Sequence, residues 1–303
     1  MGIRTLKQRI PTPDTPSRGP PRSAPIAHGE QWSLAEYVCG AGPHDRPFEE
    51  RHHKVSIALV THGTFRYRTS TGEGMLYPGA FLLGNPGACY ECGHEHSSGD
   101  RCLALAVSHD LFAEIASAAP SAERCRFRRP TLPAIADLAS ISVSLQRASE
   151  GKTPLALEEL VLTTIETIVR AAGTNHTPPR RVRSMTMGRM STVVDYIDAH
   201  LRDELNLGDL SALAAQSKYH FLRSFKQECG MTPHQYVLGR RLRAAAIALR
   251  ATNTPVSRIA FDQGFGDLST FNHAFRRVMG VAPTAYRGTR KGARGTRLGV
   301  SNM

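Results

Sequence analysis

The chain has 303 residues, of which 41% are hydrophobic, and this is long enough for two domains that each have a core. Its formal net charge of +12 at pH 7 favours a polyanionic partner such as nucleic acid, although a cationic face can equally be a solvated surface. No apolar run approaches the ~20 residues of a membrane-spanning helix, and the N-terminus lacks the apolar segment of a secretory signal. These features exclude an integral membrane protein and predict a cytoplasmic one.

Changes in composition divide the chain. The first 25 residues are rich in Pro, Arg, Ser and Thr without apolar periodicity, so they cannot bury enough surface to offset the entropy of ordering. A second change adds paired prolines to clustered positive charge, as is typical of a linker. We therefore expect a disordered arm (1–25), a sensing or dimerisation domain (26–173), a linker (174–187), a DNA-binding domain (188–288) and a basic tail (289–303).

The segment 32–107 contains short β-favouring runs, such as 54–60 and 64–68, separated by glycines and prolines. This punctuation is typical of a small barrel or jelly roll. Two helical patterns follow at 132–149 and 155–172, where apolar residues recur at intervals of three and four. Such a helix pair can pack on the barrel or on a second copy of the chain.

From residue 188 onward the pattern is almost wholly helical, and the joints are short. The fold class is therefore a two-domain α+β protein, with a β-barrel and two following helices before an all-α domain. We expect seven helices in that domain, at Met190–Leu201, Leu207–Ala215, Lys218–Cys229, Pro233–Ala251, Pro255–Gln263, Ser269–Met279 and Pro283–Tyr286.

Two parts of the helical region repeat one design, a short helix, a tight turn and a second helix with a basic and polar face. In the first, Ser217 is placed to cap the second helix, and Phe221 and Phe225 are four apart and should face the core. In the next, Gly264 suits a left-handed turn residue, and Phe271 and Phe275 repeat the core spacing, with Asp267 or Ser269 as the cap. A duplicated helix-turn-helix predicts a protein that reads two successive major grooves.

These residues resemble the DNA-binding domain of the AraC/XylS family of transcription regulators over about a third of the chain. The second unit carries the more telling motifs, which are Ile259-Ala260, Gly264-Phe265, Phe271, Phe275-Arg276, Gly280-Val281-Ala282-Pro283 and Tyr286-Arg287. The first unit ends in a similar way, with Phe225-Lys226, Gly230-Met231-Thr232-Pro233 and Tyr236. The resemblance implies a sequence-specific regulator of transcription that is not an enzyme and that binds double-stranded promoter DNA, with RNA polymerase as a further partner.

The resemblance also indicates which side chains meet DNA. Tyr219, Leu222 and Arg223, and in the second unit Ser269, Asn272 and His273, fall where family members present side chains to bases. Leu222 and Leu268 depart from the polar residues often found at such positions, although a leucine can contact a thymine methyl group. Thr270 lies on the same polar face, and Lys226, Arg276 and Arg277 would neutralise phosphates. Arg240, Arg241 and Arg243 on the connecting helix either do the same or form a solvated face.

The N-terminal domain resembles the small cupin-type barrel that many family members carry, which implies a homodimer or a small effector of unknown identity. A cysteine- and histidine-rich segment lies within it, between residues 89 and 102. Cys92, His94, His96 and Cys102 form a candidate site for Zn²⁺ or another soft metal, since thiolates and imidazoles suit such ions. The same alternation is also typical of an ordinary barrel lining.

Three other interpretations of the segment stay open. Thiols of low pKa near Arg101 would act as a redox switch. A metal-dependent oxygenase would need two histidines and a carboxylate, for which Asp100 is the only acidic residue at a short distance after the histidines. Cysteines that accept alkyl groups would make the chain a DNA-repair regulator.

Overall fold

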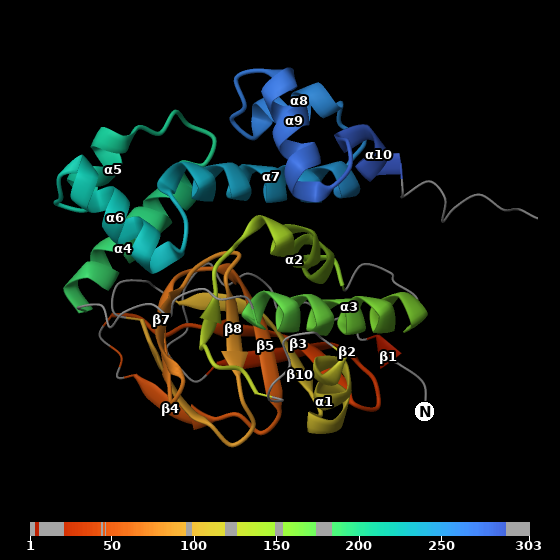
Figure 1. Cartoon of the computed structure of the whole chain (residues 1–303). Coiled ribbons are helices and arrows are strands. Elements are labelled where there is room, and N and C mark those ends of the chain that lie inside the picture. Colours follow the sequence, from red (N-terminus) through yellow and green to blue (C-terminus); the bar gives the residue numbers. More distant parts are fainter. Residues whose placement is uncertain are drawn as a thin grey trace, which may run out of the picture.

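The N-terminal part is built from two antiparallel β-sheets with helices on one side, and the C-terminal part is helical (Figure 1). This arrangement confirms the predicted two-domain α+β class. The structure is a computed structural model, and it describes residues 4–5, 21–43, 45, 47–94, 99–118, 126–148, 154–173 and 184–288. In those residues, no helix is both long and apolar enough to cross a membrane.

The two sheets differ in size and composition. The larger has the strand order β1-β2-β3-β10-β5-β8-β11, and the smaller has the order β4-β9-β6-β7. All neighbouring strands are antiparallel. The strands are β1 (Arg4–Thr5), β2 (Arg22–His28), β3 (Trp32–Cys39), β4 (Phe48–Arg51), β5 (Val55–His62), β6 (Phe65–Thr69), β7 (Gly72–Leu76), β8 (Phe81–Gly84), β9 (Cys89–Gly93), β10 (Asp100–Val107) and β11 (Thr131–Leu132).

The interior strand β5, between β10 and β8, is buried on both faces. Because successive side chains of a strand point to opposite faces, Ile57 and Leu59 lie in the core that the helices cover. Ala58 and Val60 lie in the second core, which the smaller sheet completes. This burial explains why residues 54–60 form a nearly continuous apolar run rather than an alternating one.

Helices cover the outer face of the larger sheet. The predicted helix at 155–172 is confirmed as α3 (Pro154–Gly173). The helix predicted at 132–149 is shorter, because β11 and Pro133 come first, followed by η1 (Ala136–Leu138) and α2 (Ala139–Gln146). The sequence prediction missed α1 (His109–Ser117), which begins where the Ser108 hydroxyl accepts a hydrogen bond from the Leu111 amide at 3.2 Å.

The expected arm and linker each overlap elements of the structure. Residues 4–5 form β1, which pairs with β2, and β2 begins at Arg22 and pairs with β3, so residues 4–5 and 22–25 belong to the sheet. Ala24 and Ile26 are buried at alternate positions of β2 and supply apolar contact with the core. The prediction missed this because prolines and polar residues dominate the composition of the segment. At the linker, α4 already includes residues 184–187. The rest of the expected linker and the basic tail from residue 289 lie outside the described residues.

The seven helices of the C-terminal part agree with the prediction in number and order. The described helices are α4 (Ser184–Ala199), α5 (Leu207–Leu213), α6 (Lys218–Cys229), α7 (Pro233–Ala251), α8 (Val256–Asp262), α9 (Leu268–Met279) and α10 (Pro283–Gly288). The long α7 begins with a full capping box, in which Thr232 and Gln235 each bond the backbone of the other, and it carries Pro233 in its first turn.

The two parts of the chain share a packed interface. One hydrophobic core contains barrel residues together with residues of α4, α6 and α7. Within it, the Tyr77 hydroxyl donates a hydrogen bond to the Cys229 carbonyl, and the hydroxyls of Thr64 and Ser191 are hydrogen-bonded. Beside α2, Arg147 donates to backbone carbonyls at the end of α7. The helical part is therefore docked on the barrel through polar as well as apolar contacts.

Candidate functional site

The first helix-turn-helix unit consists of α5 and α6. Its turn contains Ala215 with φ of 50°, an unusual left-handed conformation for a residue with a Cβ. The hydroxyl of Ser217 then accepts a hydrogen bond from the His220 amide and caps α6, as predicted. Phe221 and Phe225 are fully buried. The core side of α6 is thus fixed, and its other side is left for contact with a ligand.

The second unit consists of α8 and α9 and repeats this arrangement. Gly264 has φ of 79° in the turn, and the Asp267 carboxylate caps α9 by accepting from the Thr270 amide at 2.7 Å. The cap is therefore Asp267 and not Ser269, the other candidate. Phe271 and Phe275 are fully buried, which confirms the predicted core face.

The side chains predicted to meet DNA lie on the opposite face of each second helix. Tyr219 is 65% exposed although it is aromatic, and Leu222 is half-buried. The polar members of the set are accessible to a ligand as the protein stands. The exposed residues are Tyr219, Arg223, Lys226, Ser269, Thr270, Asn272, His273, Arg276 and Arg277.

Helix α7 sets the distance between the two units, and α6 and α9 lie toward its opposite ends (Figure 1). A helix of 19 residues is roughly 28 Å long at about 1.5 Å per residue. Successive major grooves on one side of a duplex are about 34 Å apart. The separation is therefore of the size needed for two reading helices on one face of DNA.

The three arginines of α7 contact other parts of the protein, so they do not form a solvated face. Arg240 forms two hydrogen bonds of 2.9 and 3.0 Å with the Asp198 carboxylate of α4. Arg243 is 3% exposed and lies against Gly79 of the barrel. Arg241 ties together two loops by donating to three backbone carbonyls. Those carbonyls belong to Leu201, Asp203 and Gly264.

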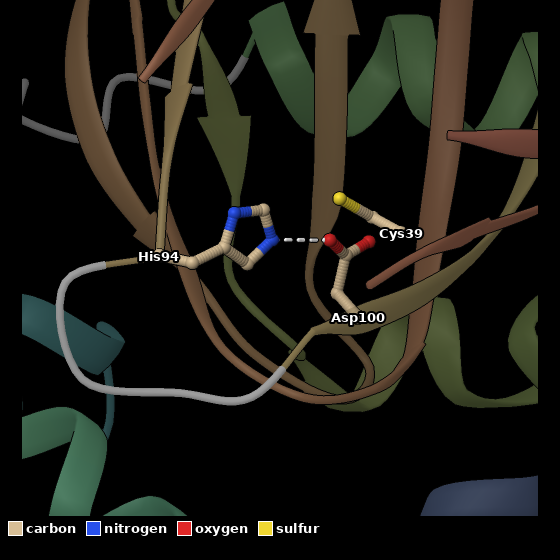
Figure 2. Close-up of side chains that lie close together, drawn as sticks. All are labelled: Cys39, His94 and Asp100. Atoms are coloured by element: carbon tan, nitrogen blue, oxygen red, sulfur yellow. Dashed lines mark hydrogen bonds and ion pairs between the residues drawn. The ribbon is translucent and has the colours of Figure 1, made fainter. Parts of the chain in front are cut away.

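The predicted metal ligands in the barrel are brought together only in part. Cys92, His94 and Cys102 are buried, whereas His96 lies outside the described residues. The donor atoms grouped most closely are those of Cys39, His94 and Asp100, all within 4.8 Å of one another (Figure 2). Cys39 was missed because its proximity comes from strand pairing and leaves no signal in the local sequence.

The pKa values of His94 and of two nearby thiols are all raised, but for different reasons. Burial alone lowers the pKa of His94, but its hydrogen bonds with Asp100 and Cys39 raise it overall to about 9. Burial raises the pKa of the Cys92 and Cys102 thiols well above the usual value. The interpretation as a redox switch with thiols of low pKa is therefore wrong for these two cysteines.

The family model that matches lies within the helical part of the chain. The family model described as a helix-turn-helix domain matches residues 210–289. The regulatory protein SoxS of Salmonella typhimurium is 34% identical over 98 residues, which are 32% of this chain and 92% of SoxS. The probable transcriptional regulator LumQ of Photobacterium leiognathi is 38% identical over 97 residues, which are 32% of this chain but only 39% of LumQ.

Two solved structures are similar more loosely. The DNA-binding domain of AdpA, in complex with a target DNA, has 28% identity and a TM-score of 0.34 over 35% of this chain and 96% of its own. ToxT from Vibrio cholerae, bound to an unsaturated fatty acid, has 11% identity and a TM-score of 0.36 over 88% of this chain and 99% of its own.

A pair of capped helix-turn-helix units with exposed basic faces, together with these sequence relatives, defines a DNA-binding regulator of transcription rather than an enzyme. The chain belongs to the AraC/XylS family of transcriptional regulators.

Proposed function

We propose that this regulator recognises a specific promoter sequence through α6 and α9, acts in the cytoplasm, and is controlled by its barrel. The observation that carries the proposal is the exposure of two polar and basic helix faces at the two ends of one rigid helix. Tyr219, Arg223, Asn272 and His273 would read bases. Lys226, Arg276 and Arg277 would contact phosphates.

Fluorescence anisotropy with DNA from the region upstream of the protein's own gene tests the two roles, base reading and phosphate contact. Arg223→Ala should cost ~1–3 kcal/mol on the preferred sequence and relax specificity at one base step. Lys226→Ala should weaken all sequences alike and reduce the salt dependence. Arg170→Ala, on the exposed surface of α3, is the matched control and should change nothing. Equal binding to all sequences by the wild type would contradict the proposal.

Control by the barrel is supported by the buried contact between the two parts of the chain. Tyr77→Phe removes only the hydroxyl that bonds the Cys229 carbonyl at the end of α6. We expect it to change DNA affinity by about fivefold, the lower end of allosteric coupling. Tyr37→Phe, at an exposed ring on β3 of the larger sheet, is the control. An unchanged affinity in Tyr77→Phe would rule out control through this contact.

A homodimer would form most simply through α3, on which Leu155 and Leu162 are 68% and 39% exposed, seven residues apart on one face. Leu155→Asp together with Leu162→Asp should then shift the molar mass in light scattering from dimer to monomer. A wild-type monomer, or a dimer that survives both changes, would refute this arrangement. Recruitment of RNA polymerase would follow promoter binding.

A further inference from the structure

Donors of three chemical kinds converge where β3 ends and β10 begins. The Cys39 sulfur, a ring nitrogen of His94 and a carboxylate oxygen of Asp100 lie within 4.8 Å of one another, and His94 Nε2 is 2.6 Å from Asp100 Oδ1 (Figure 2). Cys39 and Asp100 are opposite partners in the antiparallel ladder of the larger sheet. His94 follows β9 of the smaller sheet, so the cluster joins the two sheets.

The backbone around the cluster is packed unusually closely. Gly99 has φ of 92°, and a Cβ there would lie 2.4 Å from the Cys39 carbonyl oxygen. Gly63 has φ of 74°, and a Cβ there would lie 2.1 Å from the Gly99 carbonyl oxygen. Only glycine fits at both positions, and this close approach holds Asp100 against Cys39.

A fourth donor is adjacent. The Cys102 sulfur is 3.1 Å from Asp100 Oδ2, and its side chain is buried. Asp100 and Cys102 are two apart on one strand and therefore share a face. Ligand atoms around a tetrahedral zinc ion are about 3.3–3.8 Å apart, given bond lengths of about 2.0–2.3 Å. Cys39, His94 and Asp100 would need to draw together by on the order of 1 Å to reach this spacing, and the Cys102 sulfur would need to move further toward Cys39 and His94.

We propose that Cys39, His94, Asp100 and Cys102 bind one Zn²⁺ or a similarly thiophilic divalent cation. A buried His–Asp ion pair would explain the contact between those two side chains, but it gives no reason for two buried sulfurs beside the same carboxylate. Thiols are weak hydrogen-bond donors, and a buried carboxylate is unfavourable unless it is well compensated. A cation held by two thiolates, an imidazole and a carboxylate accounts for all four side chains.

A single residue, Phe65, lies between the proposed metal site and a contact that joins the barrel to the DNA-binding part. The Phe65 ring stacks on His94 with centroids 5.5 Å apart. Its neighbour Thr64 is hydrogen-bonded to Ser191 of α4, and both residues are buried. Reorientation of His94 by a metal would therefore shift Phe65 and with it the anchor of α4. This regulatory consequence rests on the proposed function, whereas metal binding does not.

Titration of the reduced, metal-free full chain with Co²⁺ tests the site. We expect one equivalent to bind and to give the near-ultraviolet band of thiolate-to-cobalt charge transfer. Cys39→Ser and the near-isosteric His94→Gln should each weaken binding by at least about 100-fold, and Cys102→Ser should reduce the band by about half. Cys89→Ser, at an exposed cysteine outside the cluster, is the matched control.

Absence of the band in the wild type, or equal loss in Cys89→Ser, would overturn the site. Circular dichroism of each metal-free variant tests whether it is folded. Asp100→Asn takes the place of any variant that is not.

Anisotropy with upstream DNA, with and without Zn²⁺, tests the regulatory step separately. We expect the metal to change wild-type affinity by about fivefold or more and to leave Cys39→Ser unaffected. Metal binding without such a change would overturn the coupling to α4. A wild type that binds no specific DNA under either condition would overturn the proposed function, while the cobalt titration would still decide the site.

Discussion

The two helix-turn-helix units have the same order of elements, but they differ in their turns and in what their cores contact. In the first, α5 ends at Leu213 and α6 begins at Lys218, whereas in the second α8 ends at Asp262 and α9 begins at Leu268, so the second turn is one residue longer. The left-handed position is an alanine in the first turn and a glycine in the second.

The neighbours of the two units also differ. The core of the first unit is continuous with barrel residues such as Tyr77, whereas the core of the second contains Ala139 and Val143 of α2. The same local design can therefore be stabilised by different surroundings. Because the first unit shares a core with the sheets, it is the one through which the barrel can act most directly.

The largest expected effect concerns the second turn. In Gly264→Ala, the new Cβ would lie 2.9 Å from the Arg241 guanidinium carbon and 3.0 Å from the Arg202 carbonyl oxygen, in a left-handed conformation. We expect a loss of about 2–4 kcal/mol in the free energy of unfolding, measured by urea denaturation. Gly266→Ala, where a Cβ meets nothing within 4 Å, is the control and should change stability by less than about 0.5 kcal/mol.

The next effect concerns Arg241, whose hydrogen bonds link the loop before α5 to the turn before α9. Arg241→Ala removes hydrogen bonds to carbonyls on either side and should destabilise the chain by about 2–3 kcal/mol. Because this side chain fixes the register of the two units, affinity should fall more for a full site than for a half-site. Arg258→Ala, at an exposed pair on α8, is the control. Equal losses on both DNAs would show that the units are held in register without it.

A smaller effect is expected where α6 meets β7. Burial is the larger cause, and repulsion from Glu73 the smaller, of a rise in the pKa of Glu228 from 4.5 to about 7. Its Oε1 has no hydrogen-bond partner among the described residues. The folded state therefore keeps a proton that the unfolded state loses, so this carboxyl stabilises folding least above pH 7, and its contribution falls as pH rises from about 4.5 to 7.

Glu228→Gln should remove that dependence. At pH 8 we expect it to stabilise the chain by about 1–2 kcal/mol, since one pKa unit corresponds to about 1.4 kcal/mol and partial exposure weakens the effect. Near pH 5 the gain should almost vanish. Urea denaturation across this range measures it, with Glu204→Gln at an exposed carboxyl as the control. A gain independent of pH would contradict the assigned protonation.

The smallest effect tests whether the first turn is strained. Ala215→Gly relieves a left-handed alanine but adds entropy to the unfolded chain, so we expect a net stabilisation of about 0.5 kcal/mol. Ala212→Gly, at an exposed position inside α5, should instead destabilise by about 1 kcal/mol. The same sign for both variants would show that Ala215 is not strained.

The helical half was predictable because its determinants are local. Apolar spacing, Ser217 and Asp267 at caps and Gly264 in a turn specify each element within a few residues of itself. Helix α1 was also within reach, since Ser108 precedes Leu111, Phe112, Ile115 and Ala116 at helical spacing.

The sequence by itself thus determined the two-part organisation, the paired helix-turn-helix units and their exposed polar faces, since these depend on periods of two and 3.6 residues. Only the tertiary structure decided that Arg240 and Arg241 form hydrogen bonds within the protein, that Arg243 is buried against the barrel, and that Cys39 rather than a nearer residue joins His94 and Asp100. The physical reason is that strand register and domain docking bring together residues far apart in the chain, and no local pattern encodes those pairings.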